Sequence, residues 1–486
     1  MTAIPSNNAA VELAQTRELV SQEAFGSEGF ERGVQILSRR AEAGDVDAQL
    51  LLGHLCCQFP GLPDAPHRAL TLYRAAAERG HPEALMRLTD LAMFGYGHPR
   101  DDDAAFRYLS RLAEAGYATA LCQLALLHSS GIGCAVDEAA AVTLILRAAA
   151  QGETLAFALL AERYLDGRGV ARRPDLAWAW LDLACRRHFP ASDRRRRQLS
   201  LVLTDTDKSA GDDAAQKLMD NIRSLGPAAN AIALPESDPG YAQRFAQVVA
   251  ENFMQLSDGD LSLDPAVRGE GVGPPARASV SAEPVSWEPR VFRVRRFADS
   301  QERLFLLAAA AGSLVSTGES TGADGGGEVD PFDGDCAVFA PHLVTPIVRI
   351  IQRRWAALLH IHEQHFEPMS VLRYGKGHEY SPHVDYFDSR RMAAHRSVGD
   401  LGGQRLITGL VYLVTPDGGG ETEYCVAGPR VDGADGDAVF HFNSGVDGLP
   451  DALSLHQGRP ITEGEKWLSR TAVRENNLYL NQETVL

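Results

Sequence analysis

The sequence predicts a multi-domain protein in which an N-terminal all-α solenoid precedes a C-terminal domain of short β-strands, arranged as a barrel or double sheet with supporting helices. Two observations lead to this fold class. A helical pattern repeats at intervals of 36 residues through the first half of the chain, and short β-like runs replace it in the second half. A segment rich in Pro, Gly, Ser and Asp separates the two patterns and is expected to be a linker.

The composition fits two or three globular domains and argues against several other classes. The chain has 486 residues, and a domain commonly contains about 150. Apolar residues make up 45% and charged residues 23%, which is ordinary for a globular protein and excludes a fibrous or wholly disordered chain. Acidic residues outnumber basic ones by 64 to 47. We therefore expect neither a nucleic acid nor an anionic membrane as a partner.

The cysteines and the first residues lead us to expect a cytoplasmic protein. Seven cysteines are scattered along the chain without a C-x-x-C pair, which is unlike a disulfide scaffold. The segment from Met1 to Gln15 has neither a basic start nor an apolar run, so it does not resemble a secretion signal. The apolar stretch from Leu304 to Val315 is too short to span a bilayer.

The repeat in the first half has a fixed register. A glycine is followed four positions later by alanine and eight positions later by leucine, and this pattern occurs at Gly44, Gly80, Gly116 and Gly152. A Gly-x-Gly turn recurs at 95–97, 131–133 and 167–169. Each unit is therefore predicted to be two helices joined by a glycine turn. Units of this length bury their apolar faces only by stacking on their neighbours.

The segment ALCQLALLHSSGIGCAVDEAAAVTLILRAAAQG resembles a Sel-1-like repeat, a relative of the tetratricopeptide repeats, and the resemblance covers about residues 30–200. It implies a continuous concave surface that binds a protein substrate or partner. The alternative is a rigid platform on which the other domain packs.

The arginines at 186, 187 and 194–197 are interpreted as a solvated face or cap at the end of the solenoid. The expected organisation is an N-terminal arm (1–25), the solenoid (26–230), the linker (231–285) and the second domain (286–486).

Five β-like runs indicate the second domain, namely VFRVRRF, SVLRY, RLITGLVYLV, AVFHF and WLSRTAV. One helix is predicted from about Pro341 to His360. The stretch from Ser316 to Asp330 contains five glycines and is interpreted as a flexible loop that could form a lid.

A metal site is suggested by His383 and Asp385, which are two residues apart after a β-like run. Positions i and i+2 of a strand project to the same side, so an imidazole and a carboxylate can share one ion. Non-haem Fe(II) commonly takes two histidines and one carboxylate, and His456 is the candidate for the second histidine. On its own, however, an Asp–His pair is often only a hydrogen bond.

Other motifs in this half of the chain strengthen the interpretation of His383 and Asp385 as metal ligands. The chain resembles the prolyl 4-hydroxylase branch of the Fe(II)/2-oxoglutarate dioxygenases over about residues 290–475. The motifs that carry the resemblance are Tyr374-x-x-Gly377-x-x-Tyr380-x-x-His383-x-Asp385, RLITGLVYL, GGGETEY, His456 and Lys466-Trp467. The resemblance implies a double-stranded β-helix, a distorted jelly roll whose open end holds the iron.

The resemblance also assigns roles to individual residues. It implies that His383, Asp385 and His456 bind Fe(II) and that Lys466 pairs with the C5 carboxylate of 2-oxoglutarate. Further residues expected around this cosubstrate are Tyr374, Tyr412 and, as a residue behind the site, Thr408. For the two tyrosines the alternative is packing in the core, whereas Glu421 and Thr422 are interpreted as structural. Histidines without ligand spacing are expected at the surface or in the core, and these are His360, His362, His365, His378, His395 and His441.

One departure from the family pattern concerns the substrate. Six residues after the lysine the family usually has a second tryptophan, and this chain has Ala472. We therefore expect a more open wall on the substrate side of the site.

Three functions remain open from the sequence. The first is a dioxygenase that uses Fe(II), 2-oxoglutarate and O2 to hydroxylate a prolyl residue of a protein recruited by the repeats, with ascorbate implied by resemblance alone. The second is a related oxygenase acting on a free amino acid or another substrate. The third is a non-catalytic scaffold, against which the complete set of ligands and the lysine argue. Demethylases of the AlkB type are disfavoured because they normally hold 2-oxoglutarate with arginine rather than lysine.

Overall fold

The computed structural model describes residues 7–22, 26–59, 61–224, 281–316, 332–339, 344–387, 402–426, 428–445 and 449–478. The predicted linker up to residue 280, the predicted lid from 317 to 330 and His395 lie outside these ranges. Within the described ranges, no helix combines the length and apolarity needed to cross a bilayer.

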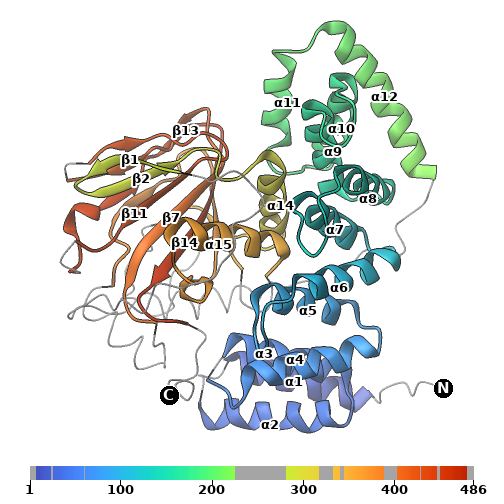
Figure 1. Ribbon diagram of the computed structural model, residues 1–486, viewed down its shortest axis with the longest axis vertical. Coiled ribbons are helices and arrows are strands. Elements are labelled where there is room, and N and C mark those ends of the chain that lie inside the picture. The colour runs from blue at the N-terminus through green and yellow to red at the C-terminus, as the bar shows by residue number, and fades with distance from the viewer. Residues whose placement is uncertain are drawn as a thin grey trace.

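The first half of the chain is a stack of paired helices, shown in blue to green in Figure 1. These helices are α1 (Asn7–Gln22), α2 (Glu28–Glu42), α3 (Val46–Gln58), α4 (Ala65–Glu78), α5 (Pro82–Phe94), α6 (Asp102–Glu114), α7 (Ala118–Ser130), α8 (Glu138–Ala150), α9 (Thr154–Asp166), α10 (Pro174–Arg186), α11 (Ser192–Ser200) and α12 (Asp205–Ser224). The predicted solenoid is thereby confirmed. The recurring alanines at 48, 84, 120 and 156 are fully buried between the helices.

The glycines of the repeat are required by the backbone. Gly131 ends α7 in the left-handed region at φ 66°, where a side chain would be strained. Two residues later, a Cβ at Gly133 would lie 2.3 Å from the carbonyl oxygen of Asp102. The following helix begins at an aspartate cap, because the Asp137 side chain accepts a hydrogen bond from the amide of Ala140. The helix end at Gly131, the close backbone approach at Gly133 and the N-cap at Asp137 together fix the register of the repeat.

The described part of the expected N-terminal arm is folded. Residues 7–22 form α1, and Val20 is buried. A Cβ at Gly33 of α2 would lie 2.3 Å from Cγ1 of Val20, so the two helices pack closely. Within the segment expected to be an arm, residues 7–22 are therefore a helix that packs against α2.

The second half contains antiparallel sheets, shown in yellow to red in Figure 1. An eight-stranded sheet has the order β1-β2-β11-β7-β14-β5-β4-β3, a four-stranded sheet the order β10-β9-β12-β6, and β13 pairs with β8. The strands are β1 (Ala282–Trp287), β2 (Arg290–Val294), β3 (Val315–Ser316), β4 (Asp335–Val338), β5 (Ser370–Tyr374), β6 (Tyr380–His383), β7 (Arg405–Val414), β8 (Gly418–Gly419), β9 (Thr422–Tyr424), β10 (Arg430–Val431), β11 (Ala438–Phe442), β12 (His456–Gly458), β13 (Ile461–Glu463) and β14 (Lys466–Arg474). This two-sheet arrangement agrees with the predicted jelly roll. Strand β1 starts inside the segment expected to be linker.

Two helices support the large sheet. Helix α15 (Pro346–Leu359) corresponds to the helix predicted from Pro341 to His360, and Pro346 at its first turn explains the later start. Helix α14 (Ser300–Ala311) was not predicted, although it includes much of the apolar stretch from Leu304 to Val315. Its capping box of Asp299 and Glu302 was a visible signal. Short 3₁₀ helices lie at Glu363–His365 and Ala452–Ser454.

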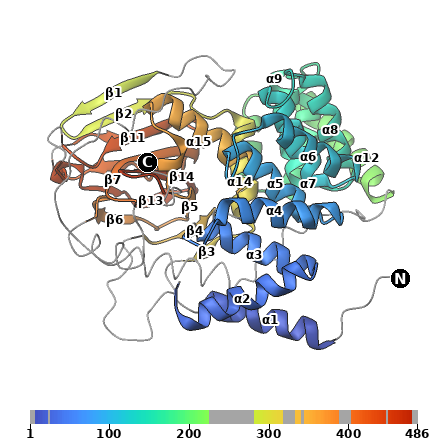
Figure 2. The same cartoon turned by 60° about the horizontal axis from the view of Figure 1, so that its bottom comes forward.

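Helices α14 and α15 lie between the large sheet and the repeats, as Figures 1 and 2 show from two directions. Trp355 of α15 packs against Phe297 and Phe440 on the sheet side, with ring centroids 4.3 and 6.1 Å away. On the repeat side, Arg349 forms a bidentate ion pair with Asp90 of α5 at 2.7 and 3.1 Å. Both side chains of this pair are at most 4% exposed. Helix α15 is thus buried on both sides.

Three further contacts join the halves. Arg353 of α15 pairs with Asp102 at 2.8 Å. Arg168, after α9, pairs at 2.9 Å with Asp299, the N-cap of α14. Arg194 of the basic cluster pairs at 2.9 Å with Asp435 of the second domain. Not all of this cluster is therefore a solvated face or cap.

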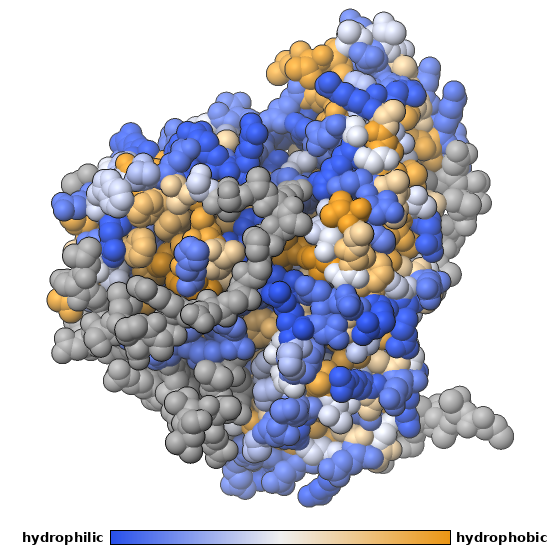
Figure 3. All heavy atoms as spheres, in the orientation of Figure 1, coloured by the Kyte–Doolittle hydropathy of each residue, from blue (hydrophilic) through white to orange (hydrophobic). Residues whose placement is uncertain are grey.

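These contacts bear on how the repeats can bind a partner. Helices α5, α7 and α9 contact α14 or α15, so an open surface does not run uninterrupted along them. Along this row of helices the repeats serve as a platform on which the second domain packs, which was the alternative interpretation of the solenoid. On the visible face in Figure 3 hydrophilic residues cover much of the surface, and apolar side chains gather in several patches, one of them at the top over the turn between α11 and α12. Leu201 and Val202 in this turn are 86% and 76% exposed.

Candidate active site

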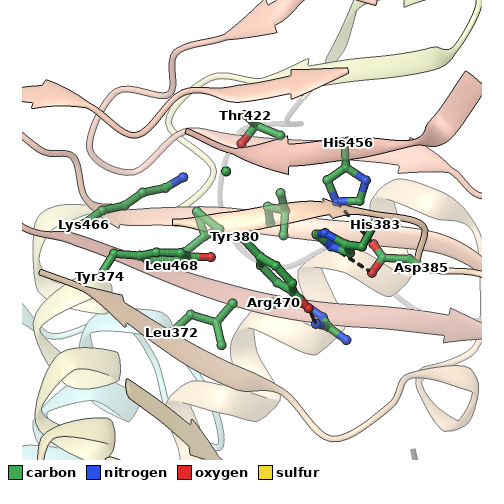
Figure 4. Close-up of a pocket in the computed structure, with 12 residues that line it drawn as sticks. Leu372, Tyr374, Tyr380, His383, Asp385, Thr422, His456, Lys466, Leu468 and Arg470 are labelled. Atoms are coloured by element: carbon green, nitrogen blue, oxygen red, sulfur yellow. Dashed lines mark hydrogen bonds and ion pairs between the residues drawn. The ribbon is translucent and has the colours of Figure 1, made fainter. Parts of the chain in front are cut away.

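The three predicted metal ligands meet at one end of a pocket between the two larger sheets. His383 ends β6 and His456 begins β12, and the two residues are directly paired in the antiparallel register. Their ligand atoms and a carboxylate oxygen of Asp385 all lie within 4.8 Å of one another. Nε2 of each imidazole is 3.8 Å from the carboxylate of Asp385. Figure 4 shows the three side chains converging.

The residues around this cluster suit a divalent metal. Nδ1 of His383 lies 2.8 Å from the carbonyl oxygen of Ser381, and Nδ1 of His456 lies 2.9 Å from that of Ser454. A carbonyl can only accept, so each Nδ1 carries the proton and each Nε2 keeps a lone pair for a metal. Oδ2 of Asp385 is buried and has no hydrogen-bond partner among the described residues. Two neutral imidazoles and one carboxylate are the expected Fe(II) set.

The protonation states agree with this assignment. Burial lowers the pKa of His383 and takes that of His456 well below its usual value. Burial alone would raise the pKa of Asp385, but the proximity of His441 and the charge of Arg470 hold it well below its usual range. The two histidines are therefore neutral and the aspartate is ionised at neutral pH.

His441 is a neighbour of this cluster that sequence reasoning placed only among surface or core histidines. It is fully buried, and its Nε2 lies 3.4 Å from Oδ2 of Asp385. Its Nδ1 hydrogen-bonds with the hydroxyl of Tyr424 at 2.9 Å. This pair supports the carboxylate from behind. The signal in the sequence was the alternation of β11, which places His441 on the same face of the strand as Val439.

Lys466 lies at the other end of the pocket (Figure 4). It is 2% exposed, and its Nζ donates a hydrogen bond of 2.7 Å to the carbonyl oxygen of Gly420. Burial lowers its pKa to about 8. Tyr374 is its register partner on β5 and lines the pocket, with Nζ 5.2 Å from the ring centroid.

The other two predicted cosubstrate residues lie behind the pocket lining. Tyr412 has its ring centroid 5.5 Å from Nζ of Lys466 and shares a hydrogen bond of 3.0 Å with the hydroxyl of Thr422. Thr422 itself lines the pocket, although it was interpreted as structural. Thr408 accepts a hydrogen bond of 3.0 Å from the side chain of Asn443. Neither Tyr412 nor Thr408 is among the described residues that form the pocket wall.

Tyr380 and Arg470 also line the pocket; the sequence motif contains Tyr380 without a role, and Arg470 was not singled out. Tyr380 stacks on His383 with a centroid distance of 3.7 Å. Arg470 lies four residues after Lys466 on β14, so the two-residue period of a strand was sufficient to place both on one face. Ala472 follows on the same face and is buried beside its register partner Thr408.

Both halves of the chain are similar to known proteins. Residues 369–474 match the 2OG-Fe(II) oxygenase superfamily, and four segments (46–81, 82–117, 118–153 and 156–188) match the Sel1 repeat. Prolyl 4-hydroxylase 1 of Arabidopsis thaliana is 30% identical over 213 residues, which cover 40% of this chain and 73% of that protein. The chain belongs to the prolyl 4-hydroxylase family. Probable prolyl 4-hydroxylase 6 of the same plant is 28% identical over 47% of this chain and 80% of its own length.

Solved structures resemble each half separately. A viral collagen prolyl hydroxylase from Paramecium bursaria Chlorella virus-1 is 23% identical and covers 38% of this chain and 95% of its own, with a TM-score of 0.30. A Sel1 repeat protein from Oxalobacter formigenes is 23% identical and covers 44% of this chain and 91% of its own, with a TM-score of 0.34. With its family and oxygenase domain established, the protein is an Fe(II)- and 2-oxoglutarate-dependent dioxygenase.

Proposed function

We propose that the protein hydroxylates prolyl residues of a protein partner at a site formed by His383, Asp385, His456 and Lys466. The observation that carries this proposal is the placement of all four residues around one pocket, with the metal ligands at one end and a buried ammonium at the other. Family membership supports prolyl hydroxylation, because the curated relatives bear that name.

Each residue has a defined task in this proposal. The Nε2 atoms of both histidines and the carboxylate of Asp385 hold Fe(II), which when bound supplies the oxidation that couples decarboxylation of 2-oxoglutarate to C–H hydroxylation. Lys466 pairs with the far carboxylate of 2-oxoglutarate, because a buried ammonium is stable only with a partner. Tyr374 and Leu468 form the wall that orients the cosubstrate, and Tyr412 supports Thr422 from behind. We include ascorbate as the reductant of the iron on the basis of family resemblance alone.

The repeats enter the proposal as the part of the chain that binds the protein partner. The presence of Sel1 repeats supports such a role. Helices α5, α7 and α9 contact α14 or α15, and the helices between them in the sequence, α4, α6 and α8, form the other row of the array. The proposed setting is the cytoplasm, which the seven unpaired cysteines support.

The test combines capture with mass spectrometry. Proteins that copurify with a His383→Ala variant are identified, returned to the active enzyme with Fe(II) and 2-oxoglutarate, and searched for one-oxygen mass gains on proline. The control is His362→Ala, an exposed histidine outside the pocket, which should behave like the native protein. Mass gains confined to another residue type, or found equally with His383→Ala, would contradict prolyl hydroxylation at this site.

A further inference from the structure

Arg470 places a second positive charge in the pocket that the proposed function does not use. On β14 the side chains of Lys466, Leu468 and Arg470 project to one side, and all three line the pocket. Figure 4 shows the guanidinium beside the hydroxyl of Tyr380, on the side of the pocket where the metal ligands lie. The two cations therefore occupy different ends of one cavity.

The partners of Arg470 leave its charge without a counterion of its own. Its Nη1 donates to the hydroxyl of Tyr380 over 3.4 Å. Asp385 and Glu367 are the described carboxylates whose charge acts on Arg470, but neither pairs with it directly, and Asp385 belongs to the metal ligands. The nearby Glu367 is already committed, because it accepts hydrogen bonds from Arg405 at 2.8 and 2.9 Å and from Arg474 at 3.1 Å. This carboxylate thus already faces two guanidinium groups.

The charge balance of the loaded pocket then favours an additional anion. The charges of Fe(II) and Lys466 balance those of Asp385 and a doubly ionised 2-oxoglutarate. Arg470 adds a positive charge to this neutral set. A charge enclosed in a pocket is unfavourable unless an opposite charge compensates it. The paired N–H groups of a guanidinium match a carboxylate especially well.

We propose that Arg470 binds a carboxylate at the metal-ligand end of the pocket. This inference rests on the proposed function. The charge balance favours a carboxylate of the substrate, as in a free amino acid or a chain end at the hydroxylated residue, because both charges of 2-oxoglutarate are already compensated. The keto-acid carboxylate of 2-oxoglutarate is the other source of the same chemical group, and the experiment distinguishes the two. Tyr380 is a positioning residue in this scheme, since its hydroxyl contacts Arg470 and its ring stacks on His383.

The first arm of the experiment measures keto-acid binding by calorimetry on the full chain loaded with Mn(II). The ligands are 2-oxoglutarate and 2-oxopentanoate, which lacks the far carboxylate. If the keto-acid end is the partner, Arg470→Gln should weaken both ligands about tenfold or more, whereas Arg470→Lys should weaken them less. Lys466→Ala serves as the contrast, because it should weaken 2-oxoglutarate and leave 2-oxopentanoate unchanged.

The second arm measures binding of glycyl-L-proline and glycyl-L-prolinamide, and of L-proline and L-prolinamide, to the protein saturated with Mn(II) and 2-oxoglutarate. If a substrate carboxylate is the partner, the native protein should prefer acid over amide, and Arg470→Gln should lose this preference while keeping its affinity for 2-oxoglutarate. Thermal unfolding of both Arg470 variants identifies any loss of binding due to misfolding. If Arg470→Gln is misfolded, Arg470→Lys is the variant used to test the carboxylate contact.

The proposal is overturned if substitution of Arg470 changes neither keto-acid affinity nor a preference for acid over amide. Failure of the native Mn(II)-loaded protein to bind 2-oxoglutarate would instead refute the proposed function. The two failures are therefore distinguishable.

Discussion

The ion pair between Asp90 and Arg349 provides a quantitative test of how firmly the two halves of the protein are joined. Asp90→Asn keeps the size of the side chain and removes its charge. Arg349 would then keep Gln352, which accepts its hydrogen bond at 3.0 Å, and the ring of Phe94 at 4.1 Å. The guanidinium would remain buried at 4% exposure without its bidentate partner.

The burial of this pair determines the expected magnitude. Breaking an exposed ion pair costs at most about 1 kcal/mol, whereas removing one partner of a buried pair costs about 3–5 kcal/mol because the other charge is left uncompensated. We therefore expect Asp90→Asn to lower the free energy of unfolding by about 3 kcal/mol. Replacing both partners, as in Asp90→Leu with Arg349→Met, should recover much of this loss, since no buried charge remains.

The assay is urea unfolding followed by circular dichroism, combined with limited proteolysis to detect separation of the halves. Glu283→Gln is the matched control, because its partner Arg295 and Glu283 are both more than half exposed. A loss for Asp90→Asn as small as that of the control would refute the reasoning that this pair is a buried, coupled contact. So would losses for Asp90→Leu and Arg349→Met, measured singly, that add up strictly in the double variant.

Three further predictions follow from the site and the interface. His383→Ala should abolish stoichiometric Fe(II) binding and 2-oxoglutarate-dependent succinate release while leaving the helical signal intact; normal metal content would remove His383 from the ligand set. The affinity for 2-oxoglutarate should be constant at neutral pH and fall by up to about tenfold per unit above pH 8, because the buried Lys466, whose pKa is about 8, then loses the charge that binds the dianion. Lys466→Arg should show no such fall, since arginine stays charged, and an identical pH profile would exclude Lys466 as the cause. Residues 281–486 expressed alone should be poorly soluble because α14 and α15 lose their cover, and coexpression with residues 1–224 should restore soluble protein; full solubility of the isolated half would argue against a packing role for the repeats.

The fold was largely predictable because its determinants are local. Gly131, Gly133 and Asp137 impose helix end, close approach and helix start within a few residues, so the period is visible in one dimension. Strand β7 is buried along its whole length, and the sequence indicates it as a run in which Leu, Ile and Val predominate. Helix α14 was not predicted because the apolar stretch was considered only as a possible membrane span. The capping box at the start of the helix was not taken into account.

The site was less completely predictable because its remaining members come from strands that are distant in sequence. His383 and Asp385 share a motif, but His441 reaches them through the pairing of β11 with β7. The interface was invisible for another reason. Asp90 and Arg349 are charged residues in amphipathic helices, which in the sequence alone are indistinguishable from solvated ones; only their partners in the other half explain their burial.

The spacing of the contacts between the halves limits how this repeat array can change in length. Asp90, Arg168 and Arg194 meet the second domain at successive points along the stack. Inserting one 36-residue unit between α6 and α9 would move the later two arginines away from Asp299 and Asp435 while Asp90 stayed in place. Units added before α3 would disturb none of these pairs. The docked part of the array, from α5 to α11, therefore has a fixed number of repeats, whereas its N-terminal end can grow without loss of these contacts.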